Sequence, residues 1–166
     1  MRKFVVTSVA LCAAALATPA IAQAPPAPPA PPPAYGETVN LEQAKKAATV
    51  AQEFAAKNGW MMAITVVGPT GDLVYFTKMD STQYASIAIS QHKARAAATF
   101  RRPTKVFEDR IGTPAGVAAI TLDGVIGSEG GIPLVIGGKI VGALGCSGGT
   151  GAQDGQTCQA GVDAMK

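Results

Sequence analysis

The side chain with the widest chemical range in this chain is His92, the only histidine in its 166 residues. An imidazole can bind a metal through one nitrogen while the other holds a hydrogen bond. On the helix predicted over residues 84–100, several small and apolar side chains recur at helical spacing around it. They are Ala85, Ala88, Ile89, Ala96 and Phe100. Two interpretations stay open: a core or interface histidine satisfied by a backbone partner, or an axial ligand to haem iron beside alanines that leave room for a flat macrocycle.

Met79 and Tyr84 are the other candidate ligands of a cofactor. A methionine sulfur can be the second axial ligand of a haem iron, although methionine more often fills a core. Tyr84 stands near the start of the same predicted helix as His92, where its hydroxyl could ligate or hydrogen-bond a cofactor. No pair among these three residues has a diagnostic spacing.

Other kinds of active site find little support in the sequence. Residues 145–149 match the G-x-S-x-G pattern of esterases, but no histidine follows Ser147 to serve as the base in the order that hydrolases use. One histidine with Cys146 and Cys158 does not complete a four-ligand zinc set, and no Gly-Lys-Ser/Thr follows the glycines as in a phosphate-binding loop. We therefore predict no catalytic residues and do not expect an enzyme.

The first 22 residues have the pattern of a cleaved secretory signal peptide. Arg2 and Lys3 precede a largely apolar run over residues 4–16, and residues 20–22 are small-x-small. The run is shorter than the roughly 20 apolar residues that cross a bilayer, and no longer one follows, which disfavours the alternative of an uncleaved anchor. The sequence thus predicts a periplasmic or secreted protein with no integral membrane segment after cleavage.

Export affects how the cysteines and the charge are interpreted. Cys146 and Cys158 would be the only cysteines left, and an oxidising compartment favours a disulfide between them, with two buried free thiols as the alternative. Losing Arg2 and Lys3 leaves a net charge near +1, without clustered cations. Nucleic-acid binding needs such clusters against phosphate, so we expect no nucleic-acid partner.

Proline dominates residues 23–38, which are predicted to form a stiff linker before a domain over residues 39–166. Asn40 and Gln43 form a capping-box pattern ahead of an alanine-rich amphipathic helix that ends at Asn58 and Gly59. Further helices are predicted over residues 84–100, with Ser81 or Thr82 as the cap, over residues 104–111, and from about residue 153 to the end.

Two turn patterns predict β-hairpins. Residues 68–72 are a Pro/Gly turn between two β-prone runs, and Gly137-Gly138 has the two-residue composition of a tight primed turn. The β-prone segments are residues 60–67, 73–79, 116–122, 132–136 and 139–146. Hairpins imply antiparallel pairing, with the helices covering the faces of the sheet.

Taken together, these segments resemble the GlcG/HbpS-like haem-binding family, which is related to the C-terminal domain of PduO-type proteins. The matching stretches are residues 69–74 and 78–80, 86–87 through 93–97, 130–134, and 141–149 with 153–154. Their order and spacing, more than any one stretch, carry the resemblance over residues 40–166.

The resemblance implies an α/β (α+β) fold, namely a profilin-like α/β/α sandwich on a five-stranded antiparallel sheet, and a homo-oligomer. It also implies binding of haem b for capture, buffering or sensing. Some relatives have an iron ligand in the first helix, where this chain has no histidine. His92 is therefore the first candidate ligand, followed by Met79 and Tyr84.

Two alternative functions without haem remain open at this stage. The chain could be an oligomeric scaffold or accessory protein whose apolar helix faces serve assembly only. It could also be an accessory protein of 2-hydroxy-acid or corrinoid metabolism, although the sequence offers no acid–base pair for such chemistry.

Overall fold

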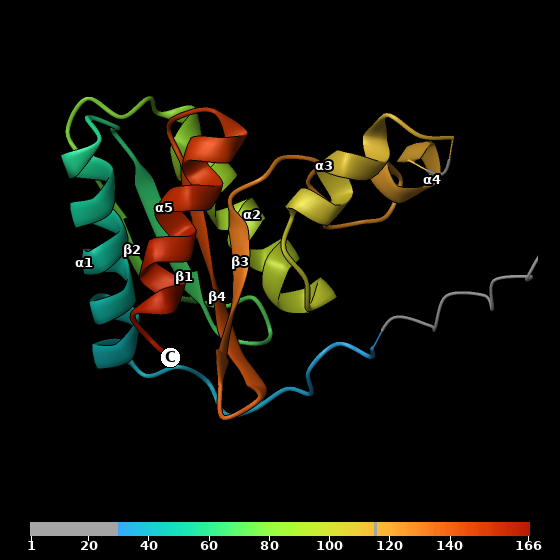
Figure 1. The fold of residues 1–166 in the computed structure, drawn as a ribbon, viewed down its shortest axis with the longest axis horizontal. Coiled ribbons are helices and arrows are strands. Elements are labelled where there is room, and N and C mark those ends of the chain that lie inside the picture. The colour runs from blue at the N-terminus through green and yellow to red at the C-terminus, as the bar shows by residue number, and fades with distance from the viewer. Residues whose placement is uncertain (1–29, 115) are drawn as a thin grey trace, which may run out of the picture. The chain divides into compact units, whose positions relative to one another are not determined.

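A four-stranded antiparallel sheet in the order β2-β1-β4-β3 forms the centre of the fold (Figure 1). The structure is a computed structural model and describes residues 30–114 and 116–166. The predicted signal peptide and the first part of the predicted linker lie outside these residues. The strands are β1 (Ala63–Val67), β2 (Leu73–Lys78), β3 (Gly131–Ile136) and β4 (Lys139–Ser147). The helices are α1 (Leu41–Lys57), α2 (Ala85–Phe100), α3 (Lys105–Ile111), α4 (Gly116–Ile120) and α5 (Gly151–Asp163).

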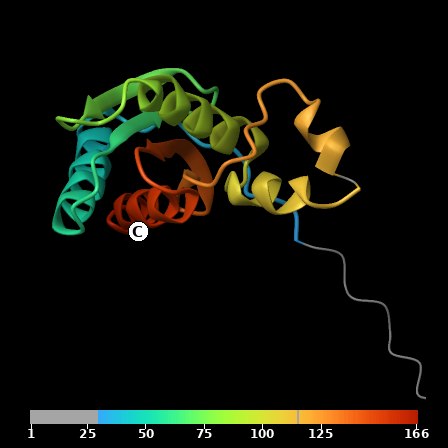
Figure 2. The ribbon, with the colours of Figure 1, turned by 90° about the horizontal axis from the view of Figure 1, so that it is seen from above.

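Helices cover both faces of this sheet. Helix α2 packs on one face across β1, β4 and β3, whereas α1 and α5 pack side by side on the other (Figure 2). The predicted mixed α/β architecture with an antiparallel sheet is therefore confirmed. Helices α3 and α4 follow α2 and extend away from the sheet before the chain returns as β3 (Figures 1 and 2).

The prediction of a fifth strand is wrong, because residues 116–122 form α4 and a turn. The N–H of Gly116 donates to the carbonyl of Thr113, and the N–H of Thr121 donates to the carbonyl of Ala118. These short-range bonds occupy backbone groups that a strand would need for pairing with a neighbour. Residues with β-prone side chains thus form a helix here, since local propensity does not decide the state of so short a segment.

The end of the predicted linker is hydrogen-bonded to the sheet. Strand β4 extends beyond its pairing with β1, and the Ile140 backbone in that stretch bonds to Ala34 and Gly36, at 2.9 and 2.8 Å. Tyr35 and Ile140 form a parallel bridge. The Tyr35 hydroxyl donates to the carbonyl of Thr99 at the end of α2, at 2.9 Å. Residues 34–36 thus join the N-terminal segment to both β4 and α2.

The helix ends test the predicted caps. The capping box of Asn40 and Gln43 is present at α1, and Gly59 after it has a φ of +71°, as expected for a left-handed C-terminal residue. Helix α5 begins two residues before the predicted start, because Thr150 and Gln153 form a second capping box. The predicted cap of α2 is wrong: Tyr84 stands at its N-cap without a side-chain hydrogen bond. None of the described helices is long and apolar enough to cross a membrane.

Both predicted hairpins are confirmed. Strand β1 pairs antiparallel with β2, and β3 pairs antiparallel with β4. Gly137 and Gly138 have φ values of +57° and +75°, as a primed turn requires. Gly145 in β4 serves a different purpose, since a Cβ at that position would collide with the carbonyl of Ser90 in α2. The glycine lets α2 lie close against the sheet.

Candidate functional site

The structure does not bring the three predicted ligands together. His92 is exposed on α2, whereas Tyr84 is 85 % exposed and lies eight residues earlier, about 12 Å along the helix axis. Met79 packs against the core on the α1 side of the sheet, and its Sδ accepts a hydrogen bond from the Met62 N–H at 3.4 Å. Of the three, His92 alone lines a cavity large enough for a ligand.

The face of α2 that carries His92 is turned away from the sheet. Of the expected apolar stripe, Ala85 and Ala88 are exposed, whereas Ala96, one turn after His92, is buried. The face against the sheet carries Ala94 and Ala97. It also carries polar groups such as Ser90, whose hydroxyl is hydrogen-bonded to Thr65 at 2.9 Å. The structure thus excludes the core interpretation of His92 within this chain. No described residue forms a hydrogen bond with its imidazole.

His92 lies in a hollow of about 690 Å³ on the outer side of α2. A second hollow of about 440 Å³ adjoins it, since Thr70 and Thr99 line both. We call the two together the α2 groove. The groove is lined by Tyr35, Gly36, Thr38, Pro69, Thr70, Gly71, Asp72, His92, Arg95, Thr99 and Gly124. Binding sites for small molecules typically have volumes of about 300–1,000 Å³, so the groove is large enough to be one.

The residues of the α2 groove fit a haem on the chemistry of their donors. The exposed His92 imidazole is a nitrogen ligand of the type that haem iron accepts, and Arg95, three residues further on, places a cation on the same helix face. Met79 and Tyr84 line no part of the groove. The residues of the α2 groove therefore fit a haem that has one histidine ligand from this chain.

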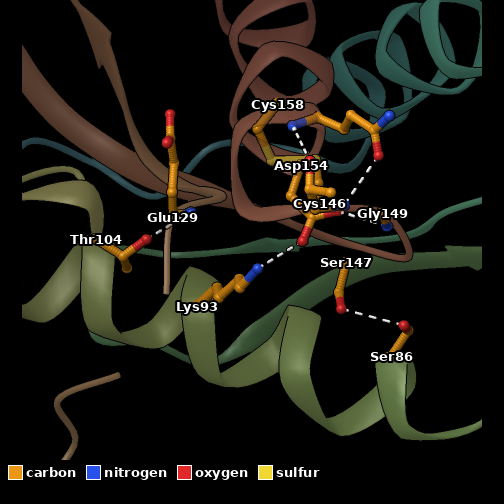
Figure 3. A network of polar contacts seen from close by, with 12 residues as sticks. Ser86, Lys93, Thr104, Glu129, Cys146, Ser147, Gly149, Asp154 and Cys158 are labelled. Carbon is orange, nitrogen blue, oxygen red and sulfur yellow. Dashed lines mark hydrogen bonds and ion pairs between the residues drawn. A yellow bond between two sulfur atoms is a disulfide. The ribbon is translucent and has the colours of Figure 1, made fainter. Parts of the chain in front are cut away.

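A second polar site lies inside the fold, at the edge of the sheet where β3 begins. The Nζ of Lys93 forms an ion pair with Asp154 Oδ2 at 2.7 Å, and both side chains are almost completely buried (Figure 3). Asp154 Oδ1 accepts a hydrogen bond from the Gly149 N–H at 2.9 Å. The pair joins α2 on one face of the sheet to α5 on the other.

A glycine at position 130 leaves room for this ion pair. Its φ is +125°, and a Cβ there would lie 2.7 Å from Asp154 Cβ and 3.0 Å from Lys93 Nζ. Burial raises the pKa of the Asp154 carboxyl above its ordinary value, and hydrogen bonds from Lys93 and Gly149 offset this only in part. Keeping the Asp154 carboxylate charged inside this network therefore costs free energy.

The raised pKa of Asp154 predicts an unusual pH dependence. Between its ordinary value of 3.8 and the higher pKa of the folded state, the folded protein binds more protons at this group than the unfolded chain does. The contribution of Asp154 to stability is therefore greatest below 3.8 and is lost as pH rises through the folded-state pKa. We expect the difference in unfolding free energy between the wild type and Asp154→Asn to change in this direction, as measured by urea unfolding from pH 3.5 to 8. A difference that does not vary with pH would contradict the expectation.

The same region contains a disulfide and a buried hydroxyl pair. Cys146 in β4 and Cys158 in α5 are joined, and both are fully buried (Figure 3). The hydroxyl of Ser147, which follows in the G-x-S-x-G pattern, is buried and donates to Ser86 Oγ at 3.1 Å. The glycines around Ser147 therefore lie in a closely packed part of the fold. Within residues 30–114 and 116–166, no three His, Cys, Asp or Glu side chains come together as a metal site.

Sequence reasoning missed Lys93, Asp154 and Arg95. Lys93 and Asp154 both lie within stretches that carry the family resemblance, but nothing in their spacing indicates that they meet across the sheet. Arg95 could have been found from its position, because residues three apart on a helix are neighbours on its surface. A cation placed in this way beside His92 was an available signal for an anionic ligand.

Comparison with known proteins identifies relatives of this chain. The sequence model of the family described as "Haem degrading protein HbpS-like" matches residues 39–163. Protein GlcG of Escherichia coli K12 is 41% identical over 111 residues, which cover 66% of this chain and 82% of GlcG.

Solved structures agree in fold. A double mutant of HbpS from Streptomyces reticuli is 27% identical, with a TM-score of 0.73, and covers 87% of this chain and 99% of its own. A PduOC protein crystallised in complex with haem has a TM-score of 0.70 at 21% identity, covering 78% of this chain and 96% of its own, and shares the fold. The family model covers residues 39–163, and the chain belongs to the GlcG/HbpS-like family.

Proposed function

We propose that this protein is an exported haem-binding protein that captures, buffers or senses haem outside the cytoplasm. The observation that carries the proposal is the exposed His92 imidazole in the α2 groove, within a family described by its action on haem. Haem b would supply a redox-active iron, and the His92 imidazole would hold it. The signal-peptide pattern of residues 1–22 supports the export part.

The chain further supports assembly with copies of itself. Four apolar side chains on and around the α3–α4 segment are between 46 % and 65 % exposed. They are Ile111, Val117, Ile120 and Leu122. Several exposed apolar side chains on one short segment are a feature of surfaces that contact another protein. The proposal therefore includes a homo-oligomer.

Titration with hemin tests the proposed function. We expect saturable binding by the purified protein, seen as a shift and sharpening of the Soret band. The variant His92→Ala should lose the shifted band or move it, because no other described imidazole can replace the iron ligand. Gln91→Ala changes the preceding residue of α2, which does not line the groove, and should bind hemin as the wild type does.

The other outcomes of this titration are also informative. Absence of a saturable Soret shift in the wild type would reject haem binding and favour the non-haem scaffold or accessory protein. An identical titration for the wild type and His92→Ala would remove His92 from the site. The family description names haem degradation, which would appear as loss of the bound Soret band over time in the presence of ascorbate and oxygen. Our proposal expects a stable band.

A further inference from the structure

We infer that Arg95 is the carboxylate-binding residue of the α2 groove, so that the groove selects tetrapyrroles with free acidic side chains. The inference rests on the proposed function, because it places the macrocycle in the same groove as His92. It assigns the groove a second point of recognition that does not involve iron.

The backbone of the β1–β2 turn holds Arg95 in place. Its Nε donates to the Gly71 carbonyl at 3.3 Å. A Cβ on Gly71 would lie 3.4 Å from Arg95 Cγ, so the turn packs against the stem of the side chain. With Nε fixed in this way, the two terminal nitrogens keep their donors for a ligand. Guanidinium donors match the two oxygens of a carboxylate in a planar, bidentate arrangement.

No acidic side chain of residues 30–114 and 116–166 lies within ion-pair distance of Arg95. Asp72 is the one acid among the lining residues of the groove, and its Oδ2 accepts a hydrogen bond from Thr70 Oγ1 at 2.7 Å. Among the described residues, the ion pairs are Lys93–Asp154, Lys105–Asp109 and Lys166–Asp163, and none of them includes Arg95. An unpaired guanidinium in a hollow, next to an unbonded imidazole, is complementary to an anionic ligand that also bears a metal.

Metal-free protoporphyrin IX tests this inference separately from iron ligation. Binding is followed by quenching of Trp60, the only tryptophan of the chain. We expect the wild type to bind the free diacid at least about tenfold more tightly than protoporphyrin IX dimethyl ester, because the ester cannot form charge-assisted hydrogen bonds. Arg95→Gln should bind the diacid as weakly as the wild type binds the ester, while its affinity for the ester stays unchanged.

Arg102→Gln is the matched control. Arg102 also donates from Nε to a backbone carbonyl, that of Phe100 at 3.0 Å, but it does not line the groove. This variant should keep the preference for the diacid. Arg95→Lys should keep part of that preference, since lysine has the positive charge but not the planar pair of donors of a guanidinium. Unchanged ester binding by Arg95→Gln shows that the groove is still folded.

Two results would overturn the inference, and they differ from failure of the proposed function. The first is wild-type affinity of Arg95→Gln for the diacid. The second is a ratio of diacid to ester affinity that is the same in the wild type and in Arg95→Gln. If hemin still binds through His92 in either case, the proposed function stands and the role of Arg95 is wrong. If the wild type binds neither hemin nor any porphyrin, both are rejected.

Discussion

Replacing Lys93 with methionine is expected to lower the free energy of unfolding by about 3 kcal/mol or more, because it leaves Asp154 buried without its cation. The two side chains are 1 % and 3 % exposed, so water cannot replace the lost partner. Urea unfolding at pH 7, followed by circular dichroism, measures the change. The loss should shrink at lower pH, since protonation removes the charge that Lys93 compensates.

A double variant separates the cost of an unpaired charge from the net value of the pair. Lys93→Met with Asp154→Leu removes both charges and should recover most of the lost stability. The attraction between two buried charges offsets little more than the free energy of desolvating them. Lys105→Met breaks the exposed pair with Asp109 and should leave stability unchanged, as solvent-exposed pairs contribute little. A wild-type stability for Lys93→Met would show that the Lys93–Asp154 contact does not form in solution.

Much of the fold was predictable because its signals are local. A few adjacent residues determine the capping box of Asn40 and Gln43, and the same is true of the turn at Gly137 and Gly138. The prediction of a fifth strand at residues 116–122 is wrong for the opposite reason. Whether a short apolar segment forms a strand depends on a free sheet edge, and that edge is a property of the whole fold.

The candidate site was predictable only in part, for a related reason. The periodicity of α2 placed His92 on a face with small side chains, but it did not show which face packs on the sheet. Hydrophobicity identified the buried positions only in part, because the buried residues of α2 include Ser86, Ser90 and Lys93 as well as alanines. The two hydroxyls have hydrogen-bond partners on the sheet, and Lys93 has its ion-pair partner on α5. Such partners come from distant parts of the sequence.

Removal of the disulfide is expected to have an effect of similar size. The double variant Cys146→Ala, Cys158→Ala should lose about 3 kcal/mol of unfolding free energy, the chain-entropy value for a bridge that closes a loop of this length. Unfolding of the wild type with and without dithiothreitol, beside the double variant, measures the loss. The reduced wild type should be less stable than the oxidised form, whereas the variant should not respond to the reductant. Equal stability in all three samples would show that the bridge does not form.

The bridge and the ion pair should depend on each other. Asp154 lies one helical turn before Cys158 on α5, and a Cβ on Gly130 would lie within 3.0 Å of both Lys93 Nζ and the Cys146 carbonyl oxygen. Each link therefore holds α5 in the position that the other requires. In a double-mutant cycle of Lys93→Met with the cysteine replacements, we expect the two losses to differ from additivity by more than about 0.5 kcal/mol. Additive losses would mean that the two links stabilise α5 independently, and that the buried carboxylate does not need the disulfide to stay in place.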